Sequence, residues 1–142
     1  MKTIKYFIVP ILFLLPAFRV SAQCNASAFS QECVIKVQDG FTFLKSFIVD
    51  GQNGIKEKVE YSYVFSKDTE YYLNVCPGVD GNDGIIVTLY DSNRRLASSN
   101  FSNGKMYPGL IFECKSTGIY YISYTFKDPK NSCGGSVLAF RR

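Results

Sequence analysis

The feature that most constrains the fold is an alternation of apolar and polar residues with a period of two, repeated along most of the chain. Between Lys58 and Phe65, every second position is apolar or aromatic, as in Val59, Tyr61 and Tyr63. Because successive side chains of a β-strand point to opposite faces, this spacing predicts a half-buried strand. Further runs of the same kind cover residues 41–49, 71–76, 85–90, 110–113, 120–127 and 136–140.

Turn-forming residues separate these runs at short intervals. Asn53-Gly54, Pro77-Gly78, Asn103-Gly104 and Asp128-Pro129 supply the fixed or positive φ that tight turns need. No long helical segment lies between the runs, which excludes a parallel sheet joined by crossover helices. We therefore predict an all-β fold, a two-sheet antiparallel β-sandwich of about seven or eight strands with jelly-roll or immunoglobulin-like topology.

The first 22 residues have the features of a secretory signal peptide. Lys2 and Lys5 precede an apolar run from Tyr6 to Phe18, and Val20-Ser21-Ala22 supplies the small side chains that a signal peptidase reads. We expect a secreted or periplasmic protein with no integral membrane segment after cleavage. The predicted organisation is a signal peptide at residues 1–22, an N-terminal arm or short helix at 23–40, and the sandwich at 41–142.

The exported part of the chain is nearly neutral. Without Lys2, Lys5 and Arg19, the 16 basic residues fall to 13, against 12 acidic residues. This balance gives no electrostatic attraction to nucleic acid, which we exclude as a partner. Within the arm, Ser27 is placed to cap a short helix.

All five cysteines lie in the exported part, where an oxidising compartment favours disulfides. They are Cys24, Cys33, Cys76, Cys114 and Cys133. Five cysteines allow at most two intramolecular bonds, and their spacing alone does not select the pairs.

The predicted topology suggests one pairing. If the strand at 85–91 runs antiparallel to the strand at 118–127, Cys76 and Cys133 flank the same end of the sheet and form our first candidate pair. Cys114 then falls at the opposite end, and we expect it to pair with Cys24 or Cys33.

Part of the chain resembles a known family. The segments that carry the resemblance are Glu70-Tyr71-Tyr72-Leu73, Ile86-Val87-Thr88-Leu89-Tyr90-Asp91, Leu110-Ile111-Phe112 and Thr117-Gly118-Ile119-Tyr120-Tyr121-Ile122. They are similar to bacterial pre-peptidase C-terminal domains, and the whole chain resembles small secreted proteins of Bacteroidetes-type bacteria. The resemblance implies a secreted, non-catalytic β-sandwich appended to exported enzymes. The chain departs from that pattern in its five cysteines, and we expect it to stand alone, with no protease attached.

The sequence contains no histidine, which removes the usual catalytic base and the usual zinc ligand. No Ser-His-Asp or Cys-His arrangement can form, and no nucleophile elbow or phosphate-binding loop is present. We therefore expect a protein that is not an enzyme.

The loop from Asp80 to Gly84 is the candidate ion site. Oxygen atoms of Asp80, Asn82 and Asp83 are ligands that calcium accepts. The same residue types are ordinary turn formers, which is the interpretation we favour. No cofactor is expected, with calcium as the alternative.

Three tyrosines fall opposite the predicted core positions, namely Tyr72, Tyr90 and Tyr121. They could form a binding platform for a protein or glycan at the cell surface, or the N-terminal segment could cover them. We predict a secreted or periplasmic interaction module, or envelope-associated accessory module. The alternative is a carbohydrate-binding or calcium-assisted adhesion module.

Overall fold

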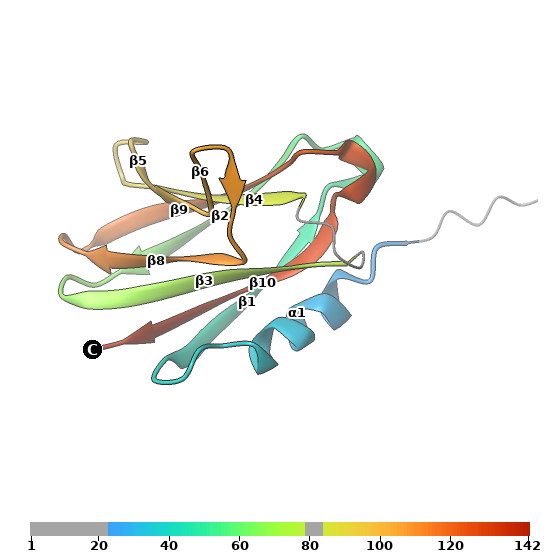
Figure 1. Cartoon of the computed structure of the whole chain (residues 1–142). Coiled ribbons are helices and arrows are strands. Elements are labelled where there is room, and N and C mark those ends of the chain that lie inside the picture. Colours follow the sequence, from blue (N-terminus) through green and yellow to red (C-terminus); the bar gives the residue numbers. More distant parts are fainter. Residues whose placement is uncertain (1–22, 79–83) are drawn as a thin grey trace, which may run out of the picture.

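Two four-stranded antiparallel sheets make up most of the computed structural model, which describes residues 23–78 and 84–142 (Figure 1). Sheet A has the order β1-β10-β3-β8, with bounds Thr42–Asp50, Cys133–Arg141, Thr69–Pro77 and Gly109–Cys114. Sheet B has the order β2-β9-β4-β5, with bounds Lys58–Phe65, Gly118–Phe126, Ile85–Tyr90 and Leu96–Ser99. The smaller elements are the hairpin strands β6 (Phe101–Ser102) and β7 (Lys105–Met106) and the 3-10 helices η1 (Gln52–Gly54) and η2 (Pro129–Asn131). The expected signal peptide lies outside the described residues.

The predicted all-β sandwich is confirmed. Strand β4 runs antiparallel to β9, from the pair Ile85 and Phe126 to the pair Tyr90 and Tyr121, as the predicted topology required. Strand β5 and the β6–β7 hairpin were not predicted. Their sequences are short and rich in serine and asparagine, so they show no apolar alternation.

The inner faces of the two sheets form one apolar core. The alternating positions of each strand point inward, so residues far apart in sequence meet between the sheets. The fully buried centre contains Leu73, Val87, Leu89, Ile122 and Leu138.

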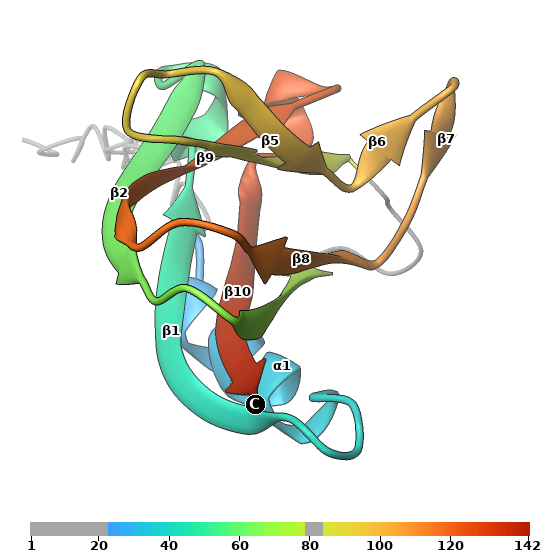
Figure 2. The same ribbon diagram turned by 90° about the vertical axis from the view of Figure 1, so that its left-hand side faces the viewer.

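A helix covers the outer face of sheet A. Helix α1 (Ala26–Ile35) packs against β1, β3 and β10, and Figures 1 and 2 both show it on the side of sheet A away from sheet B. Gly135 permits this approach, because a Cβ there would lie 2.3 Å from the Ser30 nitrogen. The helix begins at Ala26 with Asn25 as its N-terminal flanking residue, so the prediction that Ser27 caps it is wrong.

Two disulfides join the N-terminal segment to sheet A. They are Cys24–Cys133 and Cys33–Cys76, and Cys114 is a buried free thiol 3.1 Å from the Ser116 carbonyl oxygen. The predicted Cys76–Cys133 pair is wrong, and so is the expectation that Cys114 pairs with Cys24 or Cys33. Cys76 and Cys133 do lie at one end of sheet A, with Cys114 at the other, but each of the two takes its partner from the arm.

One buried hydroxyl lacks a partner within the described residues. Tyr124 is fully buried between the sheets beside Phe47 and Tyr61, and its hydroxyl has no hydrogen-bond partner there. Burial raises the pKa of Tyr124 well above its ordinary range, against a lowering contribution from the nearby Ser136 hydroxyl, which donates to the Asn74 carbonyl oxygen at 2.6 Å. A desolvated hydroxyl without a partner costs stability, so this ring contributes to folding through its apolar atoms.

Replacing Tyr124 with phenylalanine should leave the free energy of unfolding unchanged or raise it by about 1 kcal/mol, because no hydrogen bond is lost. Denaturant unfolding measures this. The matched control is Tyr61→Phe, whose hydroxyl donates to the Ile48 carbonyl oxygen at 2.7 Å. The control should lose about 1 kcal/mol. A comparable loss for Tyr124→Phe would show that its hydroxyl does bond in the folded protein.

Peptide mapping without reductant should recover Cys24 linked to Cys133 and Cys33 linked to Cys76. Iodoacetamide should label Cys114 only after denaturation, because its side chain is buried at the end of β8. Rapid labelling of Cys114 in the native protein would contradict this arrangement.

Candidate functional site

The three predicted binding tyrosines do not share a face. Tyr72 lies on β3 in sheet A, where it is buried and Phe41 packs on it with ring centroids 5.5 Å apart. Tyr90 and Tyr121 are direct neighbours on β4 and β9 of sheet B. The expected three-tyrosine platform is therefore not formed, and two adjacent tyrosines remain on the opposite side of the sandwich.

The outer face of sheet B carries a row of exposed apolar side chains. Val64 and Ile119 form a cross-strand pair between β2 and β9, and Leu96 pairs with Tyr90 between β4 and β5. The exposed fractions are 58% for Val64, 48% for Ile119 and 68% for Leu96. We call these residues, with Tyr90, Tyr121 and Arg94, the sheet B patch.

A shallow hollow of about 440 Å³ lies at one end of this patch. Ser62, Tyr63, Val64 and Ile119 line it. The apolar pair thus borders a concave part of the surface, where a side chain of another molecule could be partly enclosed.

Arg94 is held in place above the tyrosine pair. Its guanidinium carbon lies 3.6 Å from the centroid of the Tyr121 ring, and its Nη1 donates to Glu60 Oε1 at 2.8 Å. The turn that presents Arg94 is fixed by Asp91, whose Oδ1 accepts from the backbone nitrogens of Asn93 and Arg95. Arg94 therefore covers one face of Tyr121 with a preorganised cation.

Glu60 holds two cations at once. Its second carboxylate oxygen lies 3.3 Å from Lys58 Nζ, so Lys58 and Arg94 share one negative charge. Burial alone would raise the pKa of Glu60. The hydrogen bonds and charges of Arg94 and Lys58 outweigh it and lower that pKa. The net result is a small excess of positive charge beside the tyrosines.

The candidate calcium ligands Asp80, Asn82 and Asp83 lie outside the described residues. Within residues 23–78 and 84–142, no group of three or more histidine, cysteine, aspartate or glutamate side chains is placed to hold a metal ion. No described helix has the length and apolar character needed to cross a membrane.

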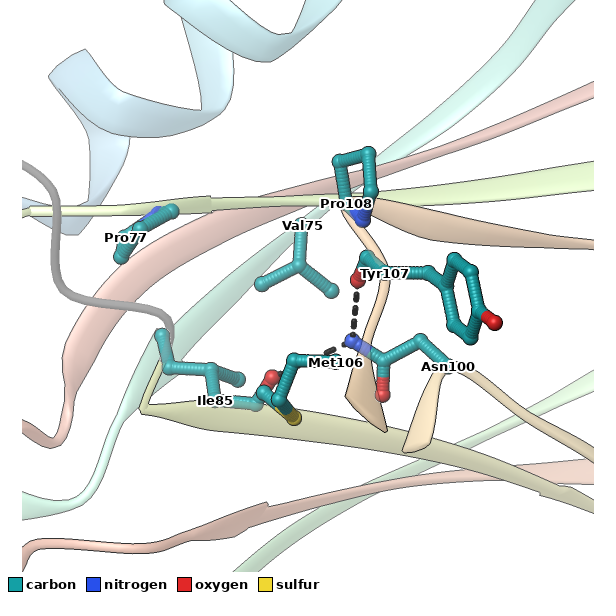
Figure 3. Close-up of a pocket in the computed structure, with 7 residues that line it drawn as sticks. All are labelled: Val75, Pro77, Ile85, Asn100, Met106, Tyr107 and Pro108. Atoms are coloured by element: carbon teal, nitrogen blue, oxygen red, sulfur yellow. Dashed lines mark hydrogen bonds between the residues drawn. The ribbon is translucent and has the colours of Figure 1, made fainter. Parts of the chain in front are cut away.

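Asn100 is a structural residue that the sequence reasoning missed. It is buried beside a cavity of about 20 Å³, where its Nδ2 donates to the carbonyl oxygens of Ile85 and Tyr107 (Figure 3). Its Oδ1 accepts from the Val87 nitrogen at 2.9 Å. The carboxamide thereby ties the segment before β8 to β4. A single asparagine among serines gave no sequence signal for this role. Arg94 was missed because its position depends on the conformation of the turn after β4.

Comparisons with known proteins give similarity to solved structures only. No protein-family model matches the chain, and no curated protein matches its sequence. The pre-peptidase C-terminal domain of collagenase from Bacillus anthracis is similar over 71% of this chain and 87% of its own, with 14% identity and a TM-score of 0.44. The glycosylation-associated protein (Gap123) complex from Streptococcus agalactiae is similar over 72% of this chain and 39% of its own, with 14% identity and a TM-score of 0.37. Similarity at these levels places the chain in neither protein's family.

Replacing Arg94 with glutamine should raise the pKa of Glu60 towards its ordinary value near 4.5, because one of the two cations is lost. In the wild-type protein, the lowered pKa adds stability above about pH 4.5 that is lost as the pH falls through the folded value. Carbon-13 titration of the carboxyl group measures the shift. The control is Lys115→Gln, which breaks the exposed pair with Glu113 and should leave Glu60 unchanged. An unchanged Glu60 pKa in Arg94→Gln would contradict the geometry.

Proposed function

We propose that this chain is a non-catalytic β-sandwich module that acts outside the cytoplasm and binds a protein partner through the sheet B patch. The observation that carries the proposal is the group of exposed apolar side chains beside two tyrosines and an arginine on the outer face of sheet B. Helix α1 covers the middle of the outer face of sheet A and leaves Ile48 and Ile111 exposed on its two outer strands, whereas Val64, Leu96 and Ile119 are exposed beside the Tyr90–Tyr121 pair on sheet B. Exposed apolar side chains that adjoin one another commonly mark interaction sites.

Two features support a location outside the cytoplasm. The first is the sequence of residues 1–22, with its lysines, apolar run and small residues at the cleavage position. The second is the pair of disulfides, which persist in oxidising compartments and are rare in the cytosol. Both features favour a secreted or periplasmic protein.

The residue types of the sheet B patch suit a protein partner. Tyrosine and arginine are enriched among residues that dominate binding energy, and apolar side chains around them exclude water. Tyr90, Tyr121 and Arg94 supply the first group, and Leu96 borders them on the same face. Lys58 and Arg94 carry two positive charges and pair with the single negative charge of Glu60, which leaves a net charge of one positive unit. The patch therefore favours a partner that brings a carboxylate next to apolar side chains.

The same geometry disfavours the carbohydrate alternative. Sugar rings stack on open aromatic faces, but the guanidinium of Arg94 already lies against one face of Tyr121. Tyr72, the third predicted aromatic residue, is buried on the other sheet. Of the three predicted tyrosines, only Tyr90 is neither covered by Arg94 nor buried on sheet A, so the predicted stacking platform for a glycan is absent.

The non-catalytic part of the proposal rests on the chemistry of the side chains. Histidine is absent from the whole sequence. The acids at the sheet B patch are committed to ion pairs, Glu60 with Lys58 and Arg94, and Asp91 with Arg95. A carboxylate held in its charged form by neighbouring cations is a poor proton donor near neutral pH.

The test places a photo-crosslinking residue, p-benzoylphenylalanine, at Leu96 in cells that export the protein. The same residue at Ile111 on sheet A, which is also exposed, serves as the control. We expect a protein adduct at position 96 only. The adduct partner is identified by mass spectrometry, purified and titrated calorimetrically against the chain.

The binding variant is Val64→Lys with Ile119→Glu. These residues face each other across two strands, so the new ion pair preserves the sheet while it removes the apolar surface. The control is Ile48→Lys with Ile111→Glu on sheet A. We expect the first variant to weaken the partner's affinity by at least about tenfold and the control to leave it unchanged. Equal affinities would overturn the proposal, and so would glycan binding that depends on Val64 and Ile119 in the absence of any protein adduct.

A further inference from the structure

We propose that the Cys24–Cys133 disulfide is a reducible latch. Exchange with a dithiol reductant at Cys24–Cys133 frees the start of the arm, residues 23–40, and a second exchange at Cys33–Cys76 then releases the arm from the outer face of sheet A while the sandwich stays folded. In each exchange the two thiols of one reductant molecule are oxidised to a disulfide, and the two protein cysteines each gain one electron and one proton to become thiols. The surface beneath the arm then becomes accessible.

The first argument is that the arm adds nothing to the main core. The apolar cluster between the sheets is made of strand residues, and no arm residue belongs to it. Cys33 of the arm packs instead in a separate small cluster with Cys76, Val137 and the partly buried Val37. Loss of the arm therefore removes no side chain from the packing that holds the two sheets together.

The second argument is that the arm is weakly held apart from its disulfides. The fully buried residues of α1 are Ala26, Ser30 and Cys33, all with small side chains, and Phe29 is its one aromatic residue, partly buried with its ring against Gly78. Docking the helix therefore buries one large apolar side chain, and that one only in part. The helix has ten residues and no side-chain N-cap, and a helix of this length is marginal by itself. One further contact is a hydrogen bond that Asn74 Nδ2 donates to the Cys33 carbonyl oxygen at 3.1 Å.

The third argument is that the two disulfides differ in access. Cys24 and Cys133 are partly exposed, whereas Cys33 and Cys76 are buried beneath the helix. Thiol–disulfide exchange requires a thiolate to reach a sulfur atom, so its rate depends on access. The geometry therefore sets an order in which Cys24–Cys133 is reduced first. Once the start of α1 separates from sheet A, the reductant can reach the Cys33–Cys76 bond.

The surface beneath the arm is apolar apart from Asn74, which donates to the Cys33 carbonyl oxygen. Val137 and Cys76 lie there almost without exposure, and Ser30 of the helix covers the backbone at Gly135. Exposed Ile48 and Ile111 lie on the same face, on the two outer strands of sheet A. Departure of the arm thus joins separate apolar side chains into one larger surface, which the oxidised protein keeps covered.

The experiment uses the exported, oxidised protein and adds dithiothreitol in steps at about pH 8, where thiolates form readily. Free thiols are trapped with iodoacetamide and mapped by mass spectrometry, and hydrogen exchange is measured at each step. We expect Cys24 and Cys133 to be alkylated before Cys33 and Cys76. Amide exchange in the arm should rise at least tenfold while β4 and β9 keep their protection.

Cys114 provides the internal control, because its buried thiol reports whether the sandwich opens. It should stay unlabelled throughout the titration. Labelling of Cys114 together with Cys24 would show that reduction unfolds the whole chain, and unchanged arm protection after full reduction would show that packing alone holds the arm. Either result would overturn the latch.

A variant pair tests the order of reduction. In Cys24→Ser with Cys133→Ser, the remaining Cys33–Cys76 bond should be reduced several-fold faster than in the wild-type protein, because the helix start is already free. In the matched variant, Cys33→Ser with Cys76→Ser, the rate at Cys24–Cys133 should be unchanged. Equal rates for Cys33–Cys76 in the first variant and in the wild-type protein would refute the sequential release.

Discussion

The contact between the inner faces of the central strands is the interaction on which the rest of the structure depends. Leu73 and Leu138 from sheet A and Val87 and Ile122 from sheet B are fully buried against one another and against their neighbours. Removal of this apolar surface from water is the main force that holds two antiparallel sheets together. The turns, the helix and both disulfides attach to a frame that this contact creates.

The alternation in the sequence was enough to predict that frame. Because the side-chain period of a strand is two, positions such as Ile85, Val87 and Leu89 identify their own face without any knowledge of the partner strand. The antiparallel pairing of β4 with β9 was expected from the order of strands in a sandwich, and the structure confirms it. Strand β5 escaped prediction because Ala97, Ser98 and Ser99 provide no apolar contrast between their two faces.

The candidate site could not be predicted to the same extent, because alternation gives a face within one strand and not the sheet to which the strand belongs. Tyr72 and Tyr121 are both opposite core positions, but they lie on opposite sides of the molecule. The position of Arg94 above Tyr121 depends on a turn conformation with φ of 62°, which no side-chain pattern encodes. Disulfide pairing failed for a related reason, since the path of the arm across sheet A is set by tertiary contacts such as that between Ser30 and Gly135.

The Cys24–Cys133 bond also determines how the molecule carries mechanical load. The bond spans 109 residues, so tension applied before Cys24 and after Arg141 passes directly from Cys24 to Cys133 and bypasses the chain between them. Only β10 is left in the line of force. This strand lies between β1 and β3 and is paired with both along its length, so its backbone hydrogen bonds resist the pull together. In its oxidised form the module is a short, stiff link, whereas in the reduced chain the same tension acts on the polypeptide from Cys24 onward.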